Sequence, residues 1–200
     1  MLIDPHSTLP LAPEAVVIGG SHGAVDALTL LLPRVQANRT TAVIVVVHLP
    51  PRRPNLLPEL FRPKVVVPVQ EVEDKQPVAP GVIWFAPPDY HLSVERDRTF
   101  SLSVEPPVRH SRPSIDVLFE SAAAVYEDRL VAIVLSGAND DGADGARAVR
   151  DAGGFVVVQS PSEAVADRMP LATIERAGPQ VVATLARIAE SLHVMTGVVA

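Results

Sequence analysis

The chain has 200 residues, enough for one globular domain that buries roughly 70% of the surface of its unfolded form. Its net charge of −6 provides no overall positive field to attract phosphate backbones, so we expect no nucleic acid partner. The chain has no cysteine, which excludes disulfides, thiolate nucleophiles and thiolate zinc sites and is typical of a reducing compartment.

The N-terminal segment, 1–14, lacks a basic region followed by an apolar core and therefore does not resemble a secretory signal. We expect it to be a flexible leader of a cytoplasmic protein. The longest apolar run, 41–50, is much shorter than the roughly 20 residues of a membrane-spanning helix, so no membrane insertion is expected. We therefore expect a leader over 1–14, one domain over 15–195 and a C-terminal tail over 196–200.

The first part of the chain predicts a strand, a tight turn, a helix and a second strand. Residues 14–20 are apolar and end in glycines, and residues 24–32 carry apolar side chains at helical spacing. The run 41–48 is almost entirely β-branched until it ends in a histidine, which is typical of a central parallel strand covered on both faces. A proline-rich stretch then leaves room for a short helix over 56–61 and a strand over 65–69.

Three short segments follow in which polar and apolar residues mostly alternate, and we expect them to form antiparallel strands in a hairpin excursion. They are 82–86, 90–95 and 99–104. The rest of the chain again alternates helices and strands. The helices are expected at 113–125, 143–152, 170–177 and 183–195, and the strands at 130–135, 154–159 and 180–182. This order predicts a three-layer, Rossmann-like α/β fold with a doubly wound, mostly parallel sheet.

Groups that can carry acid-base chemistry follow three of the predicted strands. Ser21 follows the first strand between glycines, and His48 ends the second. The loop after strand 130–135 contains Asp140 and Asp141. The carboxyl ends of parallel strands share one sheet edge, where ligands bind. Because a serine hydroxyl needs a base to accept its proton and a third group to orient that base, these residues predict a serine hydrolase site.

Each of these residues also has a purely structural explanation. A serine between glycines before a helix is more often an N-cap than a nucleophile, and a single histidine at a strand end is usually a satisfied polar group. Asp140 and Asp141, next to Gly142, fit a turn or an N-cap equally well. The residues alone therefore leave open which aspartate would orient His48.

Longer stretches of the sequence resemble one known family, the catalytic domain of chemotaxis protein-glutamate methylesterases. The stretches VVIGGSHGAVDAL at 16–28, VVVHLPP at 45–51 and RPSIDVLF at 112–119 follow one another as they do in that family. SGANDDGADG at 136–145 resembles the family motif T-G-M-G-[ND]-D-G-A-x-G. The chain is therefore similar to this family over most of its length, and the resemblance implies that 15–195 is a methylesterase catalytic domain.

The resemblance also implies a role for individual residues. It places the nucleophile at Ser21, the base at His48 and the orienting carboxylate at Asp141, the second aspartate of the pair. The reaction it implies is hydrolysis of glutamate γ-methyl esters on chemoreceptors, which releases methanol, with deamidation of receptor glutamines as a further activity. We expect no cofactor and no metal.

Departures from the family pattern lie beside the expected reaction centre. His22 replaces the usual threonine, and Ala138-Asn139 replace Met-Gly. Because backbone N–H groups survive side-chain changes, those of His22 and Ala138 are the expected oxyanion donors. Arg109 and Arg112 form a basic patch that we expect to bind substrate by pairing with acidic receptor helices, although a solvated loop explains the patch equally well.

The expected partners are methyl-accepting chemotaxis receptors. Members of the family commonly carry an N-terminal receiver domain that blocks the site until it is phosphorylated, and only about 14 residues precede the first expected strand here. Either the chain is a trimmed piece of a longer protein, or it is a stand-alone esterase domain whose control comes from a separate regulatory protein or from its expression. The sequence leaves this choice open.

Three other functions compete with this prediction. A nucleotide-binding protein would also join a strand to a helix through glycines, but Gly19, Gly20 and Gly23 do not have G-x-G-x-x-G spacing. A catalytically degenerate signalling or interaction module would keep the fold and lose the reaction, and the substitutions at His22 and Ala138 leave that alternative open. Metal-dependent hydrolysis is disfavoured because the histidines show no paired ligand spacing.

Overall fold

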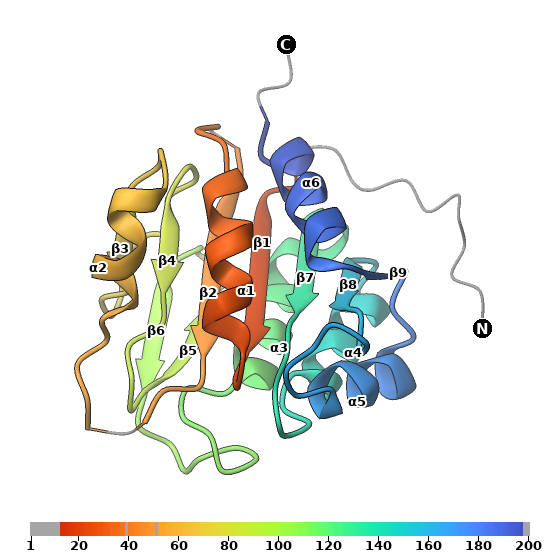
Figure 1. The fold of residues 1–200 in the computed structure, drawn as a ribbon. Helices are drawn as coiled ribbons and strands as arrows, with labels where there is room; N and C mark the ends of the chain where they lie inside the picture. Colours follow the sequence, from red (N-terminus) through yellow and green to blue (C-terminus); the bar gives the residue numbers. More distant parts are fainter. Residues whose placement is uncertain (1–12, 39, 51, 198–200) are drawn as a thin grey trace.

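A sheet of seven parallel strands forms the centre of the molecule, in the order β3-β4-β2-β1-β7-β8-β9 (Figure 1). The computed structural model describes residues 13–38, 40–50 and 52–197. The strands of the sheet are β1 (Ala15–Gly20), β2 (Ala42–Val47), β3 (Val69–Glu71), β4 (Ile83–Phe85), β7 (Leu130–Val134), β8 (Phe155–Gln159) and β9 (Val181–Ala183). The predicted α/β fold with a mostly parallel sheet is therefore confirmed.

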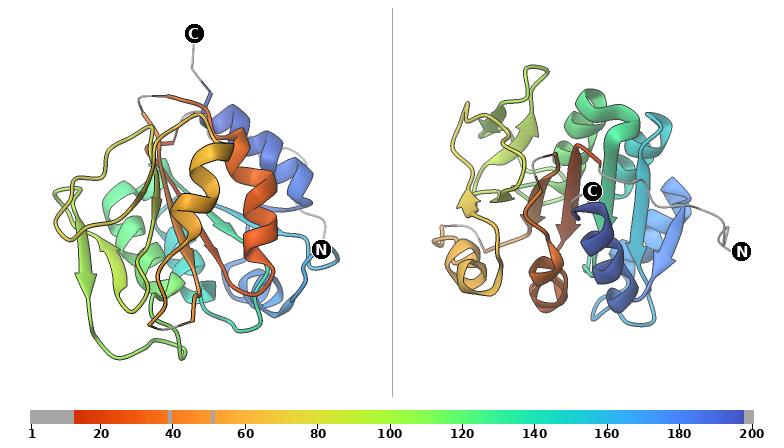
Figure 2. Two further views of the ribbon diagram at one scale, coloured as in Figure 1. Left: turned by 60° about the vertical axis from the view of Figure 1, so that its left-hand side comes forward. Right: turned by 90° about the horizontal axis from the view of Figure 1, so that it is seen from above.

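Helices cover both faces of the sheet, so the molecule has three layers (Figure 2). One face carries α1 (Ala24–Leu31), α2 (Leu57–Phe61) and α6 (Leu185–Met195), and the other carries α3 (Ile115–Tyr126), α4 (Ala143–Asp151) and α5 (Arg168–Ala177). Short 3₁₀ helices lie at η1 (Leu32–Arg34), η2 (Arg62–Lys64) and η3 (Glu127–Arg129). Each face of the sheet has its own apolar core. Across the described ranges, no helix has both the length and the apolar character needed to traverse a bilayer.

The predicted hairpin excursion consists of β5 (His91–Val94) and β6 (Phe100–Ser103), which pair antiparallel and pack against α3. The expectation that 82–86 belongs to this excursion is wrong, because that segment contains β4, a parallel strand of the main sheet. Ile83 and Phe85 enter one core and Trp84 enters the other. Successive side chains of β4 therefore point to two buried faces of the sheet, and neither face is exposed to water.

The strand expected over 65–69 is also displaced. β3 begins only at Val69, and Val66 is 75% exposed. Pro68 has no N–H to donate to a strand ladder, and its carbonyl instead accepts from the N–H of Ile83 where the pairing of β3 with β4 starts. The remaining predicted elements agree with the structure to within two residues at each end. Most of the expected leader, 1–12, and most of the expected tail, 198–200, lie outside the described residues.

The position of β1 determines where a site can form. β1 pairs with β2 on one side and with β7 on the other, so the chain winds outward from β1 in both directions. In sheets of this kind, the crevice at the carboxyl ends of the strands beside such a switch point is the usual ligand site. The carboxyl ends of β1, β2 and β7 are the strand ends at which the sequence predicts Ser21, His48 and Asp141.

Candidate active site

Ser21 lies directly after β1, where the chain leaves the sheet. Gly20 pairs with Val47 across the β1–β2 ladder, so the next residues along the two strands, Ser21 and His48, are neighbours. The N–H of Ser21 donates to the carbonyl of Ser136 at 2.9 Å, and the N–H of His48 donates to the carbonyl of Gly20 at 3.2 Å. The parallel sheet thus places the predicted nucleophile beside the predicted base.

Two glycines make the turns that follow the strands. Gly23 precedes α1 with a φ of 83°, and a Cβ there would lie 2.6 Å from the Cβ of Val165. Gly142 precedes α4 with a φ of 92°, and its Cβ would lie 2.7 Å from Cγ2 of Ile115. Both the left-handed backbone and the lack of space require glycine at these positions. Asp141 is consequently held against the start of α3.

His48 and Asp141 form the central polar contact of the site. Nε2 of His48 lies 2.8 Å from Oδ2 of Asp141. The Asp141 side chain has no exposed surface, and the His48 side chain is 12% exposed. The structure therefore brings together the base and the orienting carboxylate that the sequence predicts.

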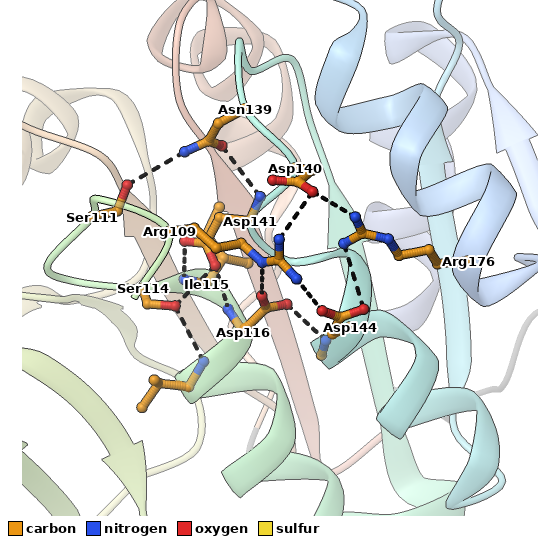
Figure 3. Close-up of polar contacts among 12 residues, drawn as sticks. Arg109, Ser111, Ser114, Ile115, Asp116, Asn139, Asp140, Asp141, Asp144 and Arg176 are labelled. Atoms are coloured by element: carbon orange, nitrogen blue, oxygen red, sulfur yellow. Dashed lines mark hydrogen bonds and ion pairs between the residues drawn. The ribbon is translucent and has the colours of Figure 1, made fainter. Parts of the chain in front are cut away.

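The N-terminus of α3 surrounds the carboxylate of Asp141 with donors (Figure 3). The hydroxyl of Ser114 donates to Oδ1 at 2.8 Å, and the backbone N–H of Ile115 donates to Oδ2 at 2.7 Å. The N–H of Asp116 donates to Oδ1 at 3.1 Å. The first N–H groups of a helix have no partner within the helix and carry partial positive charge, so they stabilise an anion here.

Burial by itself would raise the pKa of Asp141, but the hydrogen bonds from His48, Ile115 N–H and Asp116 N–H lower it below 3.8. We therefore treat Asp141 as ionised, which places the hydrogen of neutral His48 on Nε2 and leaves Nδ1 as the basic nitrogen. In the trypsin-like arrangement the aspartate binds Nδ1 and the serine faces Nε2, so the imidazole here has the opposite orientation.

Asp140 belongs to a separate ionic cluster centred on Arg109 (Figure 3). Nε of Arg109 lies 3.0 Å from Oδ2 of Asp116, and Nη1 lies 2.9 Å from Oδ2 of Asp140. Nη2 of Arg109 contacts Asp144, and Arg176 contacts both Asp140 and Asp144. All three guanidinium nitrogens of Arg109 are thus engaged, and the cluster ties the loop before α3 to α4 and α5.

Two of the three aspartates that pair with Arg109 have pKa values shifted in opposite directions. Burial raises the pKa of Asp116 to about 6, against the hydrogen bond from the N–H of Gly145. Burial would also raise the pKa of Asp140, but the hydrogen bond from Arg176 and the charge of Arg109 lower it. Asp140 is therefore an ionised partner of arginines, and it is Asp141 that contacts His48.

The expected oxyanion donors border the same edge of the sheet. His22 lies in the turn between β1 and α1, and Ala138 lies in the loop after β7, both exposed. Within the part of the chain that the structure describes, neither backbone N–H donates a hydrogen bond to another group. Both are therefore available to a substrate oxygen, as an oxyanion hole requires.

Arg112 lies at a cavity of about 430 Å³ on the His48 side of the site. Its Nη1 donates to the carbonyls of Val104 and Glu105, at 2.7 and 2.9 Å. The cavity is lined by His48, Leu49, Pro50, Asp89, Pro107, His110, Ser111 and Arg112. Of the two predicted substrate contacts, Arg109 is engaged with carboxylates, whereas Arg112 lines this cavity.

Some polar groups of the site were not singled out from the sequence as functional. The hydroxyl of Ser111 lies 3.3 Å from Nδ1 of His48, and Nδ2 of Asn139 donates to the same hydroxyl at 3.4 Å. Arg176 reaches the site from α5. Ser114 caps α3 as well as binding Asp141. No spacing in the sequence identifies these contacts, because each joins segments that are far apart along the chain.

The chain is similar to known proteins over most of its length. A family model described as CheB methylesterase matches residues 16–192. The crystal structure of the Thermotoga maritima CheB methylesterase catalytic domain matches with a TM-score of 0.85 and 30% identity, covering 91% of this chain and 98% of that one.

Curated relatives of similar sequence carry names that describe two activities. A Leptospira interrogans protein, provisionally named protein-glutamate methylesterase/protein-glutamine glutaminase, is 40% identical over 88% of this chain and 92% of its own length. The Symbiobacterium thermophilum protein of the same name is 34% identical over 88% of this chain, which spans 49% of that longer protein. The chain therefore belongs to the CheB methylesterase family.

Proposed function

We propose that this protein is a protein-glutamate methylesterase that hydrolyses glutamate γ-methyl esters with Ser21 as nucleophile, His48 as base and Asp141 as the group that orients His48. The observation that carries the proposal is the 2.8 Å contact between His48 and a buried, ionised Asp141, at the strand end next to Ser21. The names of the relatives support the ester substrate and, as a second activity, the deamidation of glutamine.

The first half of the reaction forms an acyl-enzyme. Oγ of Ser21 attacks the γ-carbonyl carbon of the ester while Nδ1 of His48 takes the hydroxyl proton. The N–H groups of His22 and Ala138 stabilise the negative oxygen of the tetrahedral intermediate. The intermediate collapses by breaking the bond to the methoxy group, which leaves as methanol with the proton from His48.

The second half of the reaction restores the serine. A water molecule gives one proton to Nδ1 of His48 and attacks the acyl carbon, and the bond to Oγ of Ser21 then breaks as the oxygen takes that proton back. The product is a glutamate side chain. With glutamine in place of the ester, the same steps release ammonia instead of methanol. Asp141 stays ionised throughout and stabilises the imidazolium.

The expected substrates are methyl-accepting chemotaxis receptors, and Arg112 at the cavity beside His48 is the proposed contact for their acidic helices. This assignment extends to the chain what the names of its relatives say.

The test is methanol release from methylated receptor membranes by the wild type and by Ser21→Ala. We expect the substitution to lower the rate by a factor on the order of 10⁵, since removing the nucleophile of a serine hydrolase removes the covalent route. Far-ultraviolet circular dichroism should show an unchanged fold. Equal rates would overturn the proposal, and a wild type that binds receptor without releasing methanol would identify a catalytically degenerate interaction module instead.

A further inference from the structure

The basic nitrogen of His48 has a second hydroxyl beside it. Ser111 Oγ lies 3.3 Å from Nδ1 of His48, whereas no hydrogen bond joins Oγ of Ser21 to His48 among the residues that the structure describes. We propose that Ser111 is a positioning residue, whose hydroxyl holds the imidazole of His48 in the plane in which Nδ1 faces the reacting serine. The proposal deepens the proposed function and rests on Ser21 and His48 acting in it.

A two-residue turn places Ser111 beside His48. The backbone N–H of Val108 donates to the carbonyl of Ser111 at 3.1 Å, and the N–H of Ser111 donates to the carbonyl of Val108 at 2.8 Å. The two central residues, Arg109 and His110, have φ values of 47° and 64°, a left-handed conformation that is unfavourable for residues with a Cβ. Such a conformation persists when surrounding contacts over-determine it.

The contacts that over-determine the turn are those of Arg109. Its guanidinium binds Asp116 at the start of α3, Asp140 in the loop after β7, and Asp144 in α4. The loop after β7 carries Asp141, and the start of α3 binds it. The turn that carries Ser111 is therefore attached to the segments that orient His48 from its Nε2 side.

A hydroxyl suits this position because it both donates and accepts hydrogen bonds. Before substrate binds, Ser111 donates to the single lone pair of Nδ1 and accepts from Nδ2 of Asn139. When Ser21 attacks, its proton replaces that of Ser111 at this lone pair, and the hydroxyl of Ser111 rotates and accepts from the new N–H until the proton passes to the leaving group. Asp141 bonds only Nε2, which leaves the ring free to tilt about that contact, and Ser111 removes this freedom from the Nδ1 side.

The experiment compares Ser111→Ala with the isosteric pair Ser111→Thr and Ser111→Val, which differ from each other only by the hydroxyl. Ser162→Ala is the matched control, because Ser162 is an exposed serine whose side chain, among the described residues, bonds only to Ser160. Two rates are measured for each variant: methanol release, separated into kcat and KM, and covalent labelling of Ser21 by a serine-directed aryl phosphonate. Thermal unfolding reports whether each variant is folded.

We expect Ser111→Ala and Ser111→Val to lower both kcat and the labelling rate about three- to tenfold, which corresponds to the loss of one hydrogen bond. KM should be unchanged, and Ser111→Thr should stay within about twofold of the wild type. Equal rates for the threonine and valine variants, a change confined to KM, or a faster reaction without the hydroxyl would each overturn the proposal. The Thr and Val pair decides the question if the alanine variant fails to fold.

Labelling does not depend on which ester is the natural substrate. A wild type that is labelled at Ser21 but releases no methanol from methylated receptor contradicts the substrate assignment and leaves the Ser111 comparison intact. A wild type that is neither labelled nor active contradicts the proposed function as a whole, and the Ser111 proposal with it.

Discussion

The two sides of the site are built in opposite ways. On the base side, Asp141 is completely buried and accepts hydrogen bonds from Ser114, Ile115, Asp116 and His48. On the nucleophile side, Ser21 is half-buried, and the exposed His22 and Ala138 present backbone N–H groups that bond to nothing else in the described parts of the chain. Within the described residues, the protein itself satisfies one side, whereas the other side leaves backbone donors open to solvent and substrate.

This difference separates two requirements of acyl transfer. A general base must be held in one orientation throughout, which the low-dielectric interior achieves with fixed donors. The oxyanion donors must bind an oxygen that is charged only in the transition state, so they gain their partner at that moment. On the base side, a substitution should therefore lower activity more when the replaced side chain contacts Asp141 directly.

On the base side, the largest effect is expected for Asp141→Asn. The amide has nearly the same shape, but one of its two terminal atoms cannot accept the hydrogen bonds of the helix or of His48, so the imidazole loses its orientation and tautomer. We expect kcat to fall by about 10⁴-fold, as for the equivalent change in other triads. Methanol release measures this directly, and a loss of less than tenfold would mean that Asp141 does not orient the base.

An intermediate effect is expected for Arg109→Met, which keeps the length of the side chain and removes its charge. Asp116 would lose its cation while its side chain remains buried, and we expect the free energy of unfolding to fall by about 1–3 kcal/mol, less than for a fully buried pair because Arg109 is 29% exposed. Urea denaturation measures the change.

Arg147→Met is the matched control for that variant. Arg147 pairs with Asp151 one turn along α4, and both side chains are more than half exposed. Pairs of this kind contribute about 0.3–0.5 kcal/mol. If the two arginine variants were equally stable, the Arg109 cluster would be an ordinary surface network without a role in holding the site.

The smallest effect is expected for Ser114→Ala, paired with Thr184→Ala. Both residues accept the N–H of the residue three positions on and so cap a helix, α3 and α6 respectively. Each variant should lose about 1 kcal/mol of stability. Only Ser114 also donates to Asp141, so only Ser114→Ala should lower kcat, by about threefold to tenfold. Unchanged kcat in both variants would show that the backbone donors alone suffice for Asp141.

Much of the fold follows from the sequence because its central strands are continuous apolar runs. The segments 41–48 and 130–135 predict buried parallel strands, and both lie beside β1 in the sheet. The failure at 82–86 has a physical cause: in three residues, alternation between two cores looks the same as alternation between core and water. Whether one face of β4 is exposed depends on its partner strands, β2 and β3, which lie outside this segment of the sequence.

The site was predictable to a similar degree. Ser21 and His48 follow from strand ends alone, whereas choosing Asp141 over Asp140 required the family resemblance. The two aspartates are adjacent and chemically identical, and they differ in which element they face: Asp141 meets the N-terminus of α3, and Asp140 meets two arginines. Ser111 was missed because its position depends on a turn fixed by carboxylates from three other segments.

The burial of Asp141 also limits how the protein can be controlled from outside. Asp141 and the α3 groups that donate to it lie within the folded domain and are out of reach of a bound partner. A partner that changes activity without unfolding part of the domain must therefore act at the exposed edge around Ser21, His22 and Ala138 or at the cavity beside His48, by covering or uncovering them.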